Sequence, residues 1–183
     1  MQSTPASFRF THPLLAAGAY ELADPRRRAE VHARLAQLVE NPETRAWQLA
    51  ASVDLPDQAV AAALEEAARH VRARGALRPA ALLLDRAREL TPADRPESAV
   101  RRAAEAAFLH FESGDSPRAE AQLRDVIAPL AAGRERARAL NVLARIRTYD
   151  ATHEAAELFL QVVAEAREIG RFSPSRTKAW RRA

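Results

Sequence analysis

The amino-acid sequence predicts an all-α protein made of stacked antiparallel helix pairs, with a small helical segment ahead of them. Three observations support this fold class. Alanine accounts for 43 of the 183 residues and glycine for only five, a composition that favours helices over strands. Apolar residues recur at helical spacing, and a helix-turn-helix pattern occurs three times from residue 56 onward.

Helix starts are marked by capping side chains and prolines. Asp24-Pro25, Asn41-Pro42 and Ser116-Pro117 each place an acceptor just before a proline, which suits the N-cap and the first helical position. Asp94 and Glu97 have the spacing of a capping pair. The only strand candidate is Phe8-Arg9-Phe10. We expect helices at residues 13–23, 26–40, 42–53, 56–74, 78–90, 96–113, 117–131, 134–148 and 152–168.

The repeat is clearest in three windows, residues 75–87, 114–126 and 150–162. Gly75 and Gly114 stand where the chain must reverse, and glycine adopts the backbone conformation that such a turn needs. Each window carries apolar residues at the same three positions, and so does the helix before it. The predicted interior sets are Ala80, Leu84, Ala87; Ala119, Leu123, Val126; Ala155, Phe159, Val162; and, in the preceding helices, Leu64, Ala68, Val71; Ala103, Ala107, His110; Ala139, Leu143, Ile146.

One such unit cannot bury its apolar face alone, so the three units are expected to stack into a short solenoid. The period is near that of tetratricopeptide repeats, and a plain helical bundle is the alternative. We therefore divide the chain into an N-terminal helical segment (1–55), tetratricopeptide-like repeats (56–169) and a basic, disordered tail (170–183).

The distribution of charge separates the tail from the rest of the chain. Residues 171–183 hold five cations and no acid, which exceeds the whole net charge of +4, so the remainder is close to neutral. Because residues 1–170 are nearly neutral, the charge pattern does not indicate nucleic-acid binding by this chain alone. Charged residues interrupt every apolar run, and LLAAGAY (14–20) is too short for a secretory signal. With no cysteine, we expect a cytoplasmic protein with no membrane partner.

The motifs of common catalysts are missing from the sequence. The single lysine, Lys178, is not part of a phosphate-binding GxxxxGK loop, and neither HExxH nor GxSxG occurs. The five histidines are scattered along the chain. We therefore expect no enzyme activity, no metal and no cofactor.

Four groups of polar or aromatic residues are candidates for a functional site. Carboxylates such as Glu65-Glu66 share faces with arginines, which predicts a solvated helix surface. His110 is expected to be a core histidine hydrogen-bonded to backbone, and Trp47 a core residue rather than a binding platform. Residues 26–28, Arg-Arg-Arg, oppose the helix dipole; they are either a solvated face or an anion or partner contact.

The segment FRFTHPLLAAGAYELADPRRRAEVHARLA (8–36) resembles a segment of the large ATP-binding regulators of the LuxR family, which are multidomain signal-transduction ATPases. The family pattern is an aromatic-x-aromatic strand, His-Pro-Leu, a helix with alanine before tyrosine, an arginine cluster and a later histidine. In this sequence the matching residues are Phe8 and Phe10, His12-Pro13-Leu14, Ala19-Tyr20, residues 26–28 and Val31-His32. Residues 45–92 and 135–146 resemble the family's passage from a winged-helix module into tetratricopeptide-like repeats.

The resemblance implies the middle part of such a regulator, without the ATPase and DNA-binding domains that family members carry. In related ATPases a histidine of this region touches the phosphates of bound ADP, which implies a nucleotide-sensing position at His12. An ATPase domain absent from this chain is then an implied partner.

Three functions follow from the sequence. The leading hypothesis is a non-enzymatic interaction or sensory module that binds a protein or peptide on the repeat surface. The second is direct DNA binding through residues 26–28 or the basic tail. The third is a non-functional fragment that keeps a residual fold.

Overall fold

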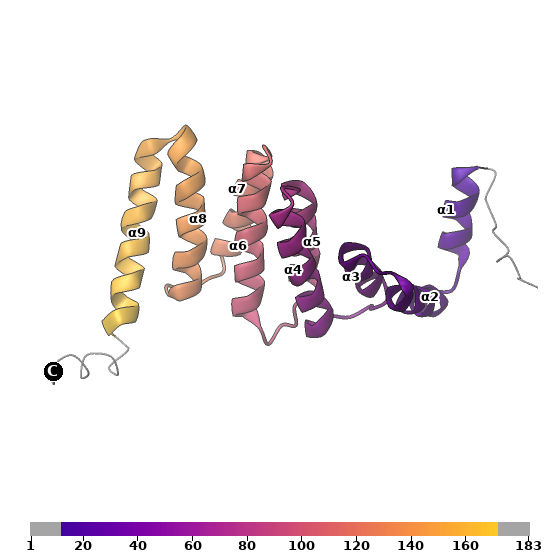
Figure 1. Ribbon diagram of the computed structural model, residues 1–183. Coiled ribbons are helices and arrows are strands. Elements are labelled where there is room, and N and C mark those ends of the chain that lie inside the picture. The colour runs from indigo at the N-terminus through magenta and orange to yellow at the C-terminus, as the bar shows by residue number, and fades with distance from the viewer. Residues whose placement is uncertain (1–11, 172–183) are drawn as a thin grey trace, which may run out of the picture.

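The computed structural model describes residues 12–171, and this part of the chain is a row of nine α-helices without a strand (Figure 1). The last six helices pack as antiparallel pairs, α4 with α5, α6 with α7 and α8 with α9, as the sequence predicts. The helices are α1 (Pro13–Leu22), α2 (Pro25–Leu38), α3 (Pro42–Ala51), α4 (Gln58–Ala73), α5 (Leu77–Glu89), α6 (Pro96–Glu112), α7 (Ser116–Ile127), α8 (Arg134–Asp150) and α9 (Thr152–Arg171).

Two of the predicted N-caps are confirmed and two predictions are wrong. Asp24 accepts the Arg27 N–H at 3.1 Å, and Asn41 accepts the Thr44 N–H at 3.0 Å. Helix α7 is capped by Asp115, because its carboxylate accepts the Arg118 N–H and Ser116 is already helical. Helix α6 has no side-chain cap, since it begins at Pro96 and leaves Asp94 two residues upstream.

The turns inside the first two pairs use glycine as predicted. Gly75 and Gly114 have φ of +80° and +90°, in the left-handed region that favours glycine. Each turn closes the preceding helix with two backbone bonds, Gly75 N–H to Arg72 O and Ala76 N–H to Val71 O in the first. The matching bonds recur after α6, so the two turns are the same structure.

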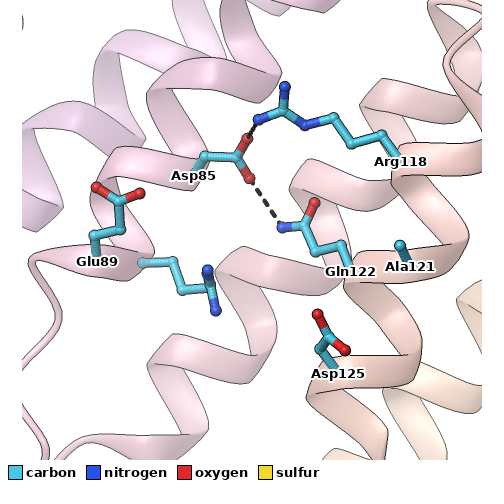
Figure 2. Close-up of a pocket in the computed structure, with 7 residues that line it drawn as sticks. Asp85, Glu89, Arg118, Ala121, Gln122 and Asp125 are labelled. Carbon is cyan, nitrogen blue, oxygen red and sulfur yellow. Dashed lines mark hydrogen bonds and ion pairs between the residues drawn. The ribbon is translucent and has the colours of Figure 1, made fainter.

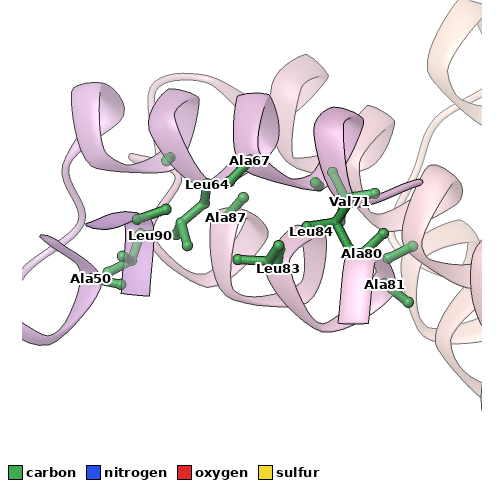
Figure 3. Packing of buried hydrophobic residues seen from close by; sticks show 14 of the residues in the cluster. Ala50, Leu64, Ala67, Val71, Ala80, Ala81, Leu83, Leu84, Ala87 and Leu90 are labelled. Atoms are coloured by element: carbon green, nitrogen blue, oxygen red, sulfur yellow. The ribbon is translucent and has the colours of Figure 1, made fainter. Parts of the chain in front are cut away.

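The core consists of two clusters that share helix α6. The first joins α3, α4 and α5, whose labelled residues Figure 3 shows, and it also includes Ala106 and Leu109 of α6. The second joins residues Ala103 and Ala107 of α6 to α7 and α8. Helix α6 is therefore buried on two sides, and it links the first helix pair to the second and third.

The repeat alignment identifies the interior correctly at all fifteen aligned positions of α4 to α8, but at only one of three in α9. All the aligned positions of α4, α5, α6, α7 and α8 are buried. In α9, Ala155 is buried but Phe159 is 38% exposed, so the prediction that Phe159 is a core residue is wrong. The reason is that no helix follows α9 within the described residues, whereas α6 and α8 cover α5 and α7.

The N-terminal helices join the repeats through α3. Ala46 and Ala50 of α3 lie in the same cluster as the buried residues of α4 and α5. The predicted strand at residues 8–10 and the tail from residue 172 lie outside the described residues, and residues 170 and 171 belong to α9. Between residues 12 and 171, no helix has both the length and the apolar composition that a bilayer crossing requires.

The two leucines at the centre of the pairs should dominate stability. We expect Leu84→Ala and Leu123→Ala each to lower the free energy of unfolding by about 2–5 kcal/mol, because both side chains are completely buried. Phe159→Ala should cost less than either, since that ring already meets solvent.

Urea denaturation followed by circular dichroism measures these losses, with Leu82→Ala as the control. Leu82 lies on the same helix as Leu84 but is 39% exposed, so its truncation should cost little. Equal losses for Leu82→Ala and Leu84→Ala would contradict the assigned packing.

Candidate interaction surface

The first helices of the three pairs line one face of the stack, which we name the α4–α6–α8 face. A groove of about 400 Å³ crosses this face. Its wall is mixed, with apolar side chains in the middle and charged side chains around them. The lining residues are Arg72 of α4; Arg101, Ala104, Glu105, Phe108 and Glu112 of α6; and Arg138, Val142 and Arg145 of α8.

Of the four arginines in this groove, three are neutralised by carboxylates of the chain itself. Arg72 lies 3.4 Å from Glu105. Arg101 pairs with Glu65 at 2.5 Å. Arg138 lies 3.1 Å from Glu135.

Arg145 differs from these three arginines. Its guanidinium carbon lies 4.2 Å above the centroid of the Phe108 ring, and no described carboxylate is within 4.0 Å of it. Cation–π stacking holds a guanidinium in place without cancelling its charge. Arg145 is therefore an oriented positive charge that is available to an incoming anion.

A second hollow of about 280 Å³ continues the groove along α6 and α8. Phe108 and Phe111 enter it from α6, and Arg145 and Tyr149 enter it from α8. The rings of Phe111 and Tyr149 are 5.2 Å apart and tilted by 46°, and Tyr149 is 77% exposed. Exposed tyrosine and arginine beside apolar rings form the kind of patch on which binding energy concentrates in protein interfaces.

A charged network between α4 and α6 supports the floor of the groove. Glu65 accepts two bonds from Arg101 at 2.5 and 2.9 Å and one from Arg102 at 2.9 Å. Arg102 is only 1% exposed, and it also donates to the Thr91 hydroxyl at 2.6 Å. The Arg101 hydrogen bonds, followed by those of Arg102, hold the pKa of Glu65 below its usual value despite partial burial. Arg101 is thereby fixed in the groove wall.

The opposite side of the stack has a hollow of about 260 Å³ between α5 and α7 (Figure 2). Asp85 lies at its edge, where Arg118 donates at 2.8 Å and Gln122 at 2.9 Å. His110 Nε2 lies 2.9 Å from the same carboxylate. Both oxygens of Asp85 are therefore used to join α5, α6 and α7, so this hollow is a structural contact between repeats.

The residues predicted as sites are not brought together by the fold. His12 is exposed and caps α1, where its Nδ1 accepts the Leu14 N–H at 3.2 Å. It contacts no other titratable side chain within the described residues, and α1 lies at the other end of the row from α8 (Figure 1). Of residues 26–28, Arg28 lies over the Tyr20 ring at 4.9 Å, and Arg27 lies 3.7 Å from Glu30.

Three other expectations need correction. His110 is buried as predicted, but its ring forms a hydrogen bond with the Asp85 side chain rather than with backbone. Trp47 is 38% exposed, because helix α3 buries only its alanine face against α4. Glu65 is not part of a solvated face, since it bonds arginines of the next repeat; its neighbour Glu66 does pair along its own helix.

The sequence pattern does not identify Phe108, Arg145 or Tyr149 as residues of a binding surface. One signal for them was present, because Phe108 and Phe111 are large apolar residues outside the interior positions of their helix. The partner that brings Arg145 to Phe108 lies on another repeat, and periodicity within one helix does not reveal it. Between residues 12 and 171, no three acidic or histidine side chains come close enough together to hold a metal ion.

The fold is similar to that of a solved repeat protein. A crystal structure of the nearly identical TPR-like repeats of a candidate kinesin light chain from Podosopora anserina superposes with a TM-score of 0.60. The two chains are 24% identical, and the match covers 91% of this chain and 82% of that chain. No model of a known protein family and no curated protein matches the sequence. At this identity the likeness concerns the fold alone, which is a tetratricopeptide-like solenoid as predicted.

The Glu65 network should make stability depend on pH. Because the folded pKa of Glu65 lies below its ordinary value of 4.5, its contribution is complete above pH 4.5 and is lost as the pH falls through the folded pKa. We expect Glu65→Gln to destabilise the chain most at neutral pH, with the difference from wild type shrinking in acid. Urea titrations at a series of pH values measure this difference.

Glu66→Gln is the matched control for this experiment. Glu66 is the next residue on α4, its side chain is 49% exposed, and it pairs only along its own helix. A Glu65→Gln penalty that stayed constant with pH, or an equal effect of Glu66→Gln, would contradict the role of the network.

Proposed function

We propose that this chain is a non-enzymatic interaction module that binds a segment of another protein on the α4–α6–α8 face. The observation that carries the proposal is Arg145, which is oriented by Phe108 and has no carboxylate partner among the described residues. Repeat solenoids use the surface formed by equivalent helices to hold extended segments or helices of their partners.

The chemistry of the groove defines the kind of segment it suits. The acids of the groove wall, Glu105 and Glu112, already lie within 4.0 Å of Arg72, so the charge left without a partner is positive. Phe111 and Tyr149 beside it offer apolar surface. The partner segment therefore carries an acidic side chain, for Arg145, next to an aromatic or aliphatic side chain, for the rings.

The resemblance to LuxR-family ATP-binding regulators supplies a more specific setting. On this proposal the chain corresponds to the middle part of such a cytoplasmic signal-transduction protein, and one of its partners is an ATPase domain. The order of three helices followed by helix-pair repeats is consistent with that origin. His12 would then occupy the nucleotide-sensing position, although in this chain its side chain serves as the cap of α1.

Direct DNA binding is less well supported than protein binding. Arg27 lies 3.7 Å from Glu30, and Arg28 lies 3.6 Å from Glu21 while stacking on Tyr20. Contacts to a phosphate backbone depend on the positive charge of arginine and lysine, and a neighbouring carboxylate offsets part of that charge. Within residues 26–28, only Arg26 has no neighbouring carboxylate among the described contacts.

Selection from a random peptide library tests the proposal. Peptides displayed on phage are selected on the full chain, and the enriched sequences are synthesised. We expect them to share an acidic residue beside an apolar residue. Arg145→Glu should weaken their binding at least tenfold, measured by calorimetry, because it replaces the attracting charge with a repelling one.

Arg88→Glu is the matched control, since Arg88 is an exposed arginine beside the α5–α7 hollow on the opposite side. It should leave affinity for the selected peptides unchanged. Peptides that bind Arg145→Glu as tightly as wild type, or binding that Arg88→Glu abolishes, would contradict the proposed surface.

A further inference from the structure

Helix α9 exposes a stripe of apolar side chains, and one of them, Phe159, stands at a repeat position that the other pairs bury. Leu84 of α5 and Leu123 of α7 are at most 1% exposed, while the aligned Phe159 is 38% exposed. Leu160 and Val163 beside it are 71% and 45% exposed. Figure 1 shows the cause, since α9 is the last helix of the row among residues 12–171 and α8 is the described helix that packs against it.

The residues of this stripe follow one line along the helix. Ala156, Leu160, Val163 and Arg167 are spaced by four, three and four residues, which places them on a single face of an α-helix. Glu157 adjoins one end of this line and Arg167 closes the other. The face is therefore apolar in the middle, acidic at its start and basic at its end.

A face with opposite charges at its two ends complements a second copy of itself in the antiparallel direction. If two α9 helices cross midway between Leu160 and Val163, Leu160 comes opposite Val163 of the second copy. Arg167 then comes opposite Ala156 of the second copy, beside its Glu157. A twofold axis repeats each of these contacts, as an isologous dimer requires.

The charges at both ends are available for such a contact. Among the described residues, Glu157 pairs with His153 alone, at 3.5 Å on its own helix, and that histidine is 92% exposed. Arg167 is exposed and forms no ion pair with a carboxylate of the described residues. Neither charge has to leave a buried partner in order to meet the other across the axis.

We propose that the chain forms a twofold-symmetric dimer through antiparallel packing of α9, with Leu160 and Val163 at its centre and Glu157–Arg167 ion pairs at both ends. This dimer leaves the α4–α6–α8 face open, because the stripe on α9 does not line the groove. Self-association is therefore independent of peptide binding, and each copy presents its own groove.

Sedimentation equilibrium of the full chain over a hundredfold range of concentration tests the dimer. The expected result is a reversible equilibrium between the 20.2 kDa chain and twice that mass. Leu160→Glu should raise the dissociation constant at least tenfold without harming the fold, because the side chain is already exposed. Leu55→Glu, at a position 76% exposed just ahead of α4, should leave the equilibrium unchanged.

A charge exchange tests the direction of packing. Glu157→Arg and Arg167→Glu should each weaken the dimer, and the double variant should restore it to near the wild-type constant, because the ion pairs reform with reversed polarity. A chain that stays monomeric throughout, or a dimer that survives Leu160→Glu, would overturn the proposal. A double variant no better than either single one would overturn the antiparallel arrangement.

Discussion

Close packing of alanine-lined helices is the constraint on which the rest of the structure depends. More than half of the buried apolar residues between residues 12 and 171 are alanines, so neighbouring helices approach closely and only a few large side chains fill each layer. Small side chains alone permit several registers of one helix against another. The fixed stack therefore needs something more than apolar burial, and carboxylates that join one helix to another supply it at several places between α4 and α9.

These carboxylates act at successive steps of the stack. Glu65 bonds arginines of α6, and Asp85 is held by residues of α6 and α7. Glu120 of α7 accepts a bond from Arg147 of α8 at 2.7 Å. Glu165 of α9 contacts Arg136 and accepts the Gly133 N–H at 3.1 Å. Sliding any one of helices α4 to α9 by one turn would strip a largely buried carboxylate of its donors, which is costly. The result is a scaffold rigid enough to hold Arg145 and the nearby rings in place.

The sequence predicts the features that depend on neighbouring residues, and it does not predict contacts between residues far apart in the chain. Helix positions, the reversals at Gly75 and Gly114 and the buried positions of α4 to α8 are set by capping, glycine and periodicity, which are local signals. The carboxylates that join repeats look the same in the sequence as solvated ones, because their partners are about thirty residues away. For the same reason the sequence does not predict the contact between Arg145 and Phe108. His12 was a candidate because of the resemblance to a family, but its side chain caps α1, away from the groove.

We propose that one face of the stack binds partner segments while the opposite side holds the stack together. Amide hydrogen exchange of the full chain, with and without a saturating library-selected peptide, tests this division. We expect slowing of exchange to be concentrated in α6 and α8, with α5 and α7 unchanged. Slowing confined to α5 and α7, or to the N-terminal helices α1 to α3, would contradict it.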